Sequence, residues 1–299
     1  MKYAIIKDYD GEHSKSLMCR VMNVSRSGYR EWCKRPICDR DKRRQLMSAK
    51  VLETYEEFEA CYGSRRIAKE LNNTGYACSE NYIASIMKAQ GVRARNGKGF
   101  KYSRHSLTMV NVSDNLLWRD FSAQYPNEKW TTDITYIWVK NKWLYLATVM
   151  DLYSRCIVGW ALDETMTEAL VTQALSVALA RRKPKPGLIL HSDRGVQYRA
   201  QGYVDFVASN RINQSMSRKG NCWDNAPMES FFSRLKVELI YAKNYQTMDE
   251  AKTGIFTYIE VFYNRKRRHS AIGNLSPVEF EERTALVVDF PYYGGHLYS

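Results

Sequence analysis

Apolar residues in the first 91 positions recur every three or four residues, as they do along one face of an amphipathic helix. The pattern predicts a helix over 15–22, a turn, and a second helix that Ser25 caps and that reaches Trp32. A second helical pair is predicted to begin at Ser64 and Ser79, each serine acting as an N-cap. We therefore expect an all-helical region built from helix-turn-helix-like pairs.

The charged segment 39–45 separates the two pairs and leads into a longer amphipathic helix, with Leu46, Leu52 and Phe58 as its apolar positions. Three basic residues lie at the start of the helix that follows Ser64. Basic residues there can contact phosphates, although they are also typical of an ordinary solvated helix face. We predict that DNA is contacted by Arg65, Arg66 and Lys69.

The helical periodicity ends at a basic, glycine-bearing stretch, and beyond it the alternation changes to that of β-strands. Three strands are expected over 129–141, 143–155 and 156–164, joined by short turns and therefore antiparallel. A helix over 167–182 then precedes the apolar strand of residues 188–190, and a strand reached through a crossover helix pairs in parallel.

The full order is three antiparallel strands, helix, strand, helix, strand, helix. It describes a ribonuclease H-like α/β fold, a mixed five-stranded sheet with flanking helices, as in the integrase catalytic core. The predicted domains are a helical DNA-binding region over 1–91, a basic linker over 92–125, the catalytic core with C-terminal helices over 126–285, and a loose tail over 286–299.

Composition supports a polyanionic partner. The chain has 299 residues and a formal net charge of +13, and residues 1–120 contribute 23 basic and 14 acidic residues, a net of +9. Its seven cysteines form no CxxC pair, which argues for free thiols in a reducing cytoplasm and against structural zinc. No apolar run reaches the length of a membrane span, so we expect no membrane partner and a cytoplasmic protein.

Three acids stand at positions where strands and helices bring side chains together. Asp133 lies within a strand of aromatic and β-branched residues, Asp193 directly follows an apolar strand, and Glu229 falls in the first turn of a helix. Three such carboxylates can hold divalent ions about 3.5–4 Å apart, the geometry of phosphodiester chemistry. The alternative roles are a turn aspartate for Asp193 and a partner of the helix dipole for Glu229.

Other polar residues near these acids are expected to have structural roles. Asp151 begins a turn and can bond nearby backbone, Asp224 is favoured as a helix cap, and His191 can pack or hydrogen-bond beside Asp193 without transferring protons. The loop 217–225 is predicted to contact DNA next to the acids.

Several strings in this order resemble the catalytic-frame protein of bacterial insertion-sequence transposases, specifically the insertion-sequence-three family. They are YGSRRIAKEL, WTTDITYI, DLYSR, HSDRGVQY, SMSRKGNCWDNAPMESFF and YNRKRRHSAIGNLSPVEF. The resemblance implies a transposase that cuts element ends to 3′-hydroxyls and joins them to DNA. Its implied metal triad is Asp133, Asp193 and Glu229, with Mg²⁺ as cofactor, two ions per site and Mn²⁺ as a substitute.

The resemblance also gives Lys236, two helical turns after Glu229, the role of holding the transposon end. Further DNA contacts are predicted for two basic residues of the loop 217–225, which are Arg218 and Lys219. They are also predicted for the basic run 265–268, with a solvated helix end as the alternative: Arg265, Lys266, Arg267 and Arg268.

The implied partners are double-stranded DNA with terminal inverted repeats, further copies of the chain on that DNA, and an upstream-frame protein as fusion or partner. A transposase-derived DNA-binding regulator and a ribonuclease H-type nuclease are the alternative functions.

Overall fold

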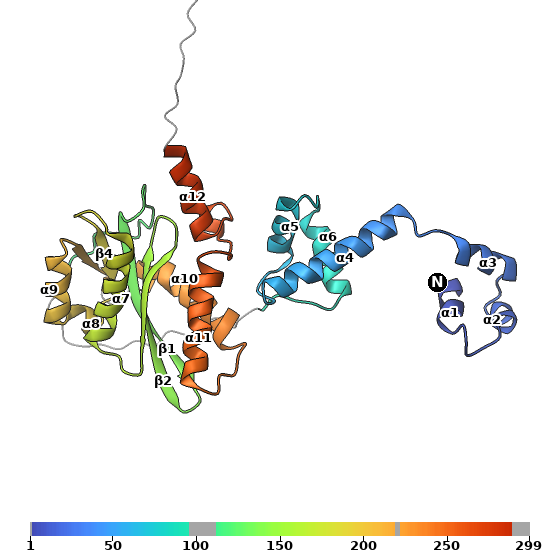
Figure 1. Cartoon of the computed structure of the whole chain (residues 1–299), viewed down its shortest axis with the longest axis horizontal. Helices are drawn as coiled ribbons and strands as arrows, with labels where there is room; N and C mark the ends of the chain where they lie inside the picture. Colours follow the sequence, from blue (N-terminus) through green and yellow to red (C-terminus); the bar gives the residue numbers. More distant parts are fainter. Residues whose placement is uncertain (1, 96–111, 219–221, 289–299) are drawn as a thin grey trace, which may run out of the picture. The chain divides into compact units, whose positions relative to one another are not determined.

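The computed structural model describes residues 2–95, 112–218 and 222–288. The chain divides into two compact units, Met1–Ala94 and Arg95–Ser299. The first unit is entirely helical in its described part, and the second contains a β-sheet with helices on both faces (Figure 1).

The first unit follows the predicted order of helices. They are α1 (Lys2–Asp8), α2 (Lys15–Val21), α3 (Arg26–Lys34), α4 (Asp39–Glu57), α5 (Ser64–Asn73) and α6 (Glu80–Ala89). The Ser25 hydroxyl accepts the Gly28 N–H at 3.0 Å, and the Ser79 hydroxyl accepts the Tyr82 N–H at 3.2 Å. Both predicted caps are therefore confirmed, whereas the cap predicted at Ser64 is wrong because Gly63 takes that position.

The apolar face predicted for the long helix is confirmed at Phe58, which is buried at the end of the helix, and is wrong at the other two positions. α4 buries Met47, Val51 and Thr54, while Leu46 and Leu52 are exposed. The charged segment 39–45 belongs to the helix itself and does not precede it. Positions 47, 51 and 54 follow the four- and three-residue spacing of one helix face, and that face packs on α5 and α6.

The second unit is organised around five strands: β1 (Lys129–Val139), β2 (Lys142–Asp151), β3 (Ile157–Asp163), β4 (Ile189–Ser192) and β5 (Asn213–Met216). Their order across the sheet is β3-β2-β1-β4-β5. β1 is antiparallel to β2, as β2 is to β3, whereas β4 is parallel to both β1 and β5. The predicted mixed sheet is thus confirmed.

Helices cover the two faces of this sheet and enclose two apolar cores. One face packs against α7 (Glu168–Arg182), α8 (Val196–Arg199) and α9 (Gln201–Ser209), around Trp130 and Leu175. Here α7 lies so close to β3 that a Cβ on Gly159 would stand 2.4 Å from the Ala174 carbonyl oxygen. Only glycine fits this approach.

The opposite face packs against α10 (Ala226–Leu235) and α11 (Met248–Phe256), around Ile137, Phe231 and Ile259. Each of these helices continues into a π-helical turn, η2 (Lys236–Ile240) after α10 and η3 (Thr257–Tyr263) after α11.

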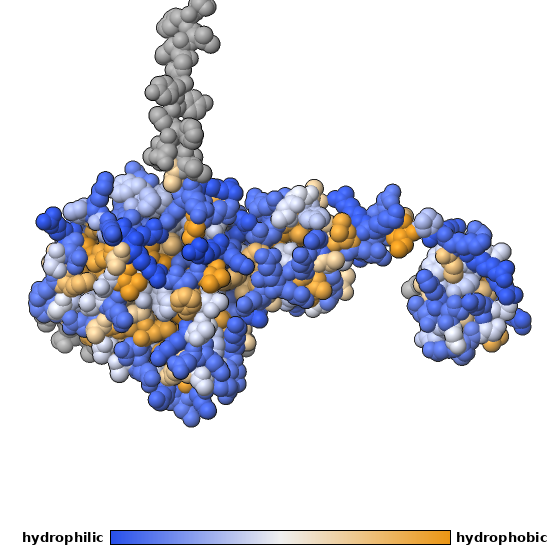
Figure 2. Space-filling view, viewed as in Figure 1, coloured by the Kyte–Doolittle hydropathy of each residue, from blue (hydrophilic) through white to orange (hydrophobic). Residues whose placement is uncertain are grey.

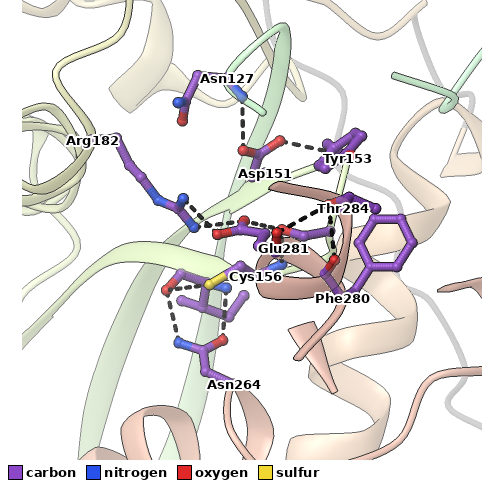
Figure 3. Close-up of polar contacts among 11 residues, drawn as sticks. Asn127, Asp151, Tyr153, Cys156, Arg182, Asn264, Phe280, Glu281 and Thr284 are labelled. Carbon is purple, nitrogen blue, oxygen red and sulfur yellow. Dashed lines mark hydrogen bonds and ion pairs between the residues drawn. The ribbon is translucent and has the colours of Figure 1, made fainter. Parts of the chain in front are cut away.

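A polar cluster links the last helix, α12 (Pro277–Val288), to α7 and to the turn after β2 (Figure 3). The Arg182 guanidinium donates two 2.8 Å hydrogen bonds to the two carboxylate oxygens of Glu281. Asn264 bonds the backbone N–H and C=O of Ile157, which ties η3 to β3. Asp151 accepts from the backbone N–H groups of Asn127 and Tyr153, so its predicted bonding to nearby backbone is confirmed.

The segment 112–128 leads into β1 without a helix or strand of its own, yet it packs on the sheet's unit. The Met216 N–H donates to the Asp114 carbonyl at 3.1 Å, and Leu117 is buried. Figure 2 shows apolar residues gathered in patches among hydrophilic ones on the visible face of the second unit. In the described ranges no helix has both the length and the apolar character needed to span a membrane.

Candidate active site

The strand register places Asp133 and Asp193 side by side. β1 and β4 are parallel, and Thr131 pairs with His191. Two residues further along each chain come Asp133, still within β1, and Asp193, one residue past the end of β4. Neighbouring strands lie about 4.8 Å apart, so the two carboxylates share one edge of the sheet.

Burial and mutual repulsion dominate the electrostatics of this pair. The pKa of Asp133 is held well above its usual range, first by burial and then by the negative charges of Asp193 and Glu229. The pKa of Asp193 is also raised by burial. Each aspartate accepts a 2.8 Å backbone hydrogen bond, Asp133 from Ile134 and Asp193 from Gly195, and these bonds act in the opposite direction.

Glu229 reaches the pair from α10, whose start is fixed to β1. The Asn225 side chain donates to the Thr132 carbonyl at 3.3 Å and accepts from the Thr131 hydroxyl. These two threonines immediately precede Asp133. Burial raises the pKa of Glu229, and its charge in turn acts on Asp133.

Lys236 lies on the same side of the sheet, at the first position of η2. Burial lowers its pKa, while Asp133 acts to raise it. Its Nζ stands 4.8 Å from the centroid of the Tyr136 ring, and only 9% of the residue is exposed. The ammonium therefore lies between an acid and an aromatic ring.

The predicted capping role of Asp224 is wrong, because this residue is a buried hub. Its carboxylate is fully buried and accepts from Asn115 at 3.0 Å, from Arg119 at 2.9 Å and from three N–H groups of Arg218 at 2.9–3.1 Å. These bonds, those of Arg218 first, hold the pKa of Asp224 well below its usual range. The hub joins the segment before β1 to the loop that precedes α10.

His191 is fully buried and supports the site from the adjoining strand. Its two ring nitrogens lie 2.8 Å from the Ser215 hydroxyl and 3.1 Å from the Ser217 hydroxyl. Burial lowers its pKa to about 4, so the ring is neutral at pH 7, and its two hydrogen bonds confirm the expected structural role beside Asp193.

Two further residues border the acids without having been predicted. Thr148 lies directly opposite Asp133 on β2, and its buried hydroxyl has no hydrogen-bond partner among the described residues. Tyr198 bonds the Thr132 hydroxyl at 3.3 Å, and the charges of Asp133 and Asp193 add to burial in raising its pKa. Thr148 lies in none of the motifs, and Tyr198 ends the string HSDRGVQY, where nothing local indicates a place beside the acids, so only the three-dimensional arrangement reveals them.

The residues at this edge fit a divalent cation in their chemistry. Carboxylate oxygens are the ligands that Mg²⁺ prefers, and an unpartnered hydroxyl at Thr148 marks a polar space beside Asp133. In the described ranges, no three His, Cys, Asp or Glu side chains are placed closely enough to hold a metal ion. The charges of Asp193 and Glu229 act on Asp133, but the three carboxylates are not close enough together to coordinate one ion.

The residues predicted to contact DNA differ in their exposure and in their side-chain partners. Arg65 and Lys69 are exposed on α5, where Arg65 Nε lies 3.1 Å from Glu80 Oε1, and Arg66 lies 5.3 Å from the Tyr62 ring centroid. Arg218 is engaged by Asp224, and Lys219 lies outside the described residues.

In the basic run 265–268, Arg265 and Lys266 are exposed, and Arg268 donates to the Asn274 carbonyl at 2.9 Å. Arg267 is 3% exposed and forms a two-bond ion pair with the equally buried Glu238, at 2.8 Å for each bond. The prediction that Arg267 contacts DNA is therefore wrong, because its guanidinium is closed off inside the protein.

Family comparisons agree with this arrangement. Two models, each described as an integrase core domain, match residues 123–222 and 229–285, and a model of an HTH-like domain matches 41–99. The first match includes both aspartates, and the second begins at Glu229. Fold and site thus define a protein with an integrase core preceded by a helix-turn-helix-like domain, which lies on α4–α6.

Curated relatives narrow the class to one family. Transposase InsF for insertion sequence IS3A of Escherichia coli (strain K12) is 42% identical over 285 residues, 95% of this chain and 99% of the relative. The IS600 uncharacterized 31 kDa protein of Shigella sonnei is 40% identical over 266 residues, 89% of this chain and 98% of the relative. The chain belongs to the IS3 family of insertion-sequence transposases.

Among solved structures, a simian T-cell lymphotropic virus intasome in complex with a PP2A regulatory subunit is 16% identical, with a TM-score of 0.45 over 83% of this chain and 77% of that chain.

Proposed function

We propose that this transposase is a metal-dependent polynucleotidyl transferase whose catalytic residues are Asp133, Asp193 and Glu229. The observation that carries the proposal is the parallel register of β1 and β4, which sets the two aspartates side by side within the electrostatic reach of Glu229. The three carboxylates are half-buried, and half-buried carboxylates that repel one another gain from a shared cation.

The three carboxylates would hold Mg²⁺, or Mn²⁺ in its place, with two ions per site. Ions held there would stabilise the charge on the attacking and leaving oxygens of a phosphodiester. To share a cation the three carboxylates would have to lie closer together than they do in the described residues, and the charge of Lys236 acts to lower the pKa of Asp133.

The reaction consists of two displacements at phosphorus. In the first, water attacks the phosphodiester at the element's end, a P–O bond forms to the water oxygen, and the 3′ oxygen leaves with a proton. In the second, that 3′-hydroxyl attacks another phosphodiester, and the displaced 3′ oxygen of that strand leaves in turn. The enzyme forms no covalent bond to DNA.

Double-stranded DNA is the partner on this proposal. The exposed cations of α5, Arg65 and Lys69, and those of the tail, Arg265 and Lys266, would contact its phosphates. Recognition of terminal inverted repeats, assembly of several copies on DNA and cooperation with an upstream-frame protein extend the same proposal.

The test is strand joining by the purified full chain with a labelled oligonucleotide of the source element's end. Wild type is expected to give joined product with Mg²⁺ or Mn²⁺. Asp193→Asn should reduce product at least 1000-fold while leaving DNA affinity unchanged, because a ligand of the cation is lost. The matched control, Asp205→Asn, changes an exposed acid of α9 and should keep wild-type activity.

The outcomes also separate the alternative functions. Nicked strands without joined product, under every condition, would identify a ribonuclease H-type nuclease. DNA binding with neither product, even after fusion to an upstream-frame segment, would identify a regulator. As a readout independent of activity, Mg²⁺ should raise the melting temperature of wild type but not that of Asp193→Asn.

A further inference from the structure

The side of β2 that faces α10 carries one polar side chain in an otherwise apolar row. Successive residues of a strand alternate between the two faces of a sheet, so four residues of β2 share this side: Leu144, Leu146, Thr148 and Met150. The three apolar members belong to the core around Phe231. Thr148 is as deeply buried as they are, with 0% of its surface exposed.

The hydroxyl of Thr148 has no hydrogen-bond partner among the described residues. A buried hydroxyl without a partner destabilises a fold, and valine has nearly the same shape without that cost. Packing alone therefore favours valine at this position. A partner that the hydroxyl gains in another arrangement of the neighbouring side chains would account for threonine.

Two cross-strand neighbours flank Thr148 on the same face of the sheet. They are Asp133 on β1 and Trp160 on β3, each directly opposite Thr148 in the register. The indole N–H of Trp160 is engaged by Glu260 at 2.8 Å, and an indole has no acceptor to offer. Of the two neighbours, only Asp133 can accept a hydrogen bond from the Thr148 hydroxyl.

The carboxylate of Asp133 has an oxygen available for that bond. Its Oδ1 accepts the Ile134 N–H at 2.8 Å, and Oδ2 accepts no hydrogen bond from the described part of the chain. Directly opposite residues of an antiparallel pair have Cβ atoms about 4.5–5.5 Å apart, so a side-chain rotation brings a hydroxyl within reach of a carboxylate. A bond from Thr148 would displace none that Asp133 already makes.

The order of the strands gives such a bond a direction. β1 lies between β2 and β4, so Thr148 and Asp193 stand on opposite sides of Asp133. A donor on the β2 side binds the Asp133 carboxylate from the side away from Asp193, and lone pairs toward Asp193 stay open. Carboxylates that ligate cations are themselves held by hydrogen bonds of this kind.

We propose that Thr148 is a positioning residue, whose hydroxyl donates to the Asp133 carboxylate and orients it to share a divalent cation with Asp193. The inference rests on the proposed function and adds a residue outside the three acids. Thr148 itself touches neither the cation nor the reacting phosphate. Its loss therefore weakens cation binding while the acids remain in place.

The test compares cation binding with stability in the full chain. Thr148→Val removes the hydroxyl and nearly keeps the shape. Mn²⁺ affinity, measured by isothermal titration calorimetry, should fall about 10- to 100-fold. The midpoint of urea unfolding in EDTA should be unchanged or higher, because a buried hydroxyl without a partner is removed. A merely structural role predicts the reverse, a lower midpoint with wild-type Mn²⁺ affinity.

Three further variants serve as controls. Thr148→Ser keeps the hydroxyl and should stay within about threefold of the wild-type Mn²⁺ affinity. Thr172→Val removes a hydroxyl from α7, on the other face of the sheet, where it donates to the Glu168 carbonyl at 3.0 Å, and should leave the affinity unchanged. Asp193→Asn lacks a proposed ligand and measures Mn²⁺ binding elsewhere on the chain. Where Thr148→Val fails to fold, Thr148→Ala replaces it with the same expected loss of affinity.

Strand joining gives a second readout. The Mg²⁺ concentration for half-maximal product should rise about 10- to 100-fold in Thr148→Val, with a rate near that of wild type at saturating Mg²⁺. Wild-type Mn²⁺ affinity in Thr148→Val, or equal losses in Thr148→Val and Thr148→Ser, would overturn the positioning role and leave the transferase proposal standing. If wild type bound Mn²⁺ no more tightly than Asp193→Asn, the proposed metal site would be overturned, and the positioning role with it.

Discussion

At the scale of single residues, burial decides which side chains carry charge. The same sheet edge contains carboxylates whose pKa values are raised, a histidine that stays neutral and a lysine whose pKa is lowered. Each shift has burial as its largest cause, and the specific neighbours modify it. A residue's role at this edge therefore depends on what surrounds it more than on its type.

His191 should make the protein's stability depend on pH in a defined direction. Its pKa falls from about 6.5 in the unfolded chain to about 4 in the folded one. Between these values the unfolded state binds the proton, so this contribution to stability is complete above pH 6.5 and is lost as pH falls toward 4. The full effect corresponds to about 3 kcal/mol.

The measurement is the unfolding free energy of wild type and His191→Gln between pH 7 and pH 4.5. In a plot of unfolding free energy against pH, the variant should lose the part of the slope that His191 causes. The buried Asp151, whose pKa is raised to about 6, favours the folded state at low pH in both proteins, so their difference isolates the histidine. The exposed control His13→Gln should keep the wild-type slope, and an unchanged slope in His191→Gln would contradict the assignment.

The same substitution at two arginines of the run 265–268 should change different properties, the stability of the fold at Arg267 and the binding of DNA at Arg265. Arg267→Met leaves Glu238 buried without its cation, although the Tyr258 hydroxyl still donates to it, and should lower the unfolding free energy by about 3–5 kcal/mol. Once folded, that variant should bind DNA as wild type does. Arg265→Met removes an exposed charge and should change stability by less than about 0.5 kcal/mol. Denaturant unfolding and salt-controlled DNA titration measure the two effects, and weakened binding by folded Arg267→Met would contradict the structural role.

At the scale of elements, the position of α10 depends on polar contacts at its start. Asn225 bonds the two threonines that precede Asp133, and Asp224 joins Asn115, Arg119 and Arg218. The helix itself has no side-chain cap at Asn225. Its N-terminus is fixed to the sheet through these side chains, and with it the direction in which Glu229 points.

Asp224→Asn should therefore impair the reaction without touching a reacting atom. The variant keeps the shape of the side chain but loses its charge and part of its accepting capacity, so unfolding free energy should fall by about 1–3 kcal/mol. Strand joining should fall at least tenfold, and a higher Mg²⁺ concentration should restore part of it because the displaced Glu229 weakens cation binding. Wild-type Mg²⁺ dependence in a less stable variant would show that Asp224 only stabilises the fold.

At the scale of the whole molecule, two units share one basic chain. The HTH-like match lies on α4–α6 of the first unit, and the acids lie in the second. The net charge of +13 makes DNA affinity sensitive to salt, because each phosphate contact releases counterions. The slope of log affinity against log salt therefore reports the number of phosphate contacts made by the whole chain.

Removing two cations from α5 should reduce that slope. Arg65→Gln/Lys69→Gln should make it about 1.8 units less steep, at about 0.9 per phosphate lost. The matched control Arg40→Gln/Lys42→Gln changes two exposed cations of α4 within the same unit. Equal slopes for the two double variants would contradict a specific role for α5.

Sequence patterns alone determined the order of strands and helices and the candidate triad. Alternation along β1 and β2 and the apolar run before Asp193 are local properties, so they are legible without a structure. Side-chain partners between distant positions are not local. Arg267 and Arg265 look equivalent in the run RKRR, and only the packing of η2 and η3 selects Arg267 for a buried pair with Glu238, 29 residues away.

The same reason explains the other differences. The sequence predicts that Leu46 and Leu52 are buried, but α5 and α6 pack against a different face of α4. Asp224 is a residue type that favours helix caps, but its carboxylate instead binds Arg119, which lies 105 residues away in the sequence. Local sequence thus determined the elements and the chemistry available at their ends. The tertiary structure decided which charges are buried, which are paired and which remain exposed to solvent, because those depend on contacts between residues far apart in the chain.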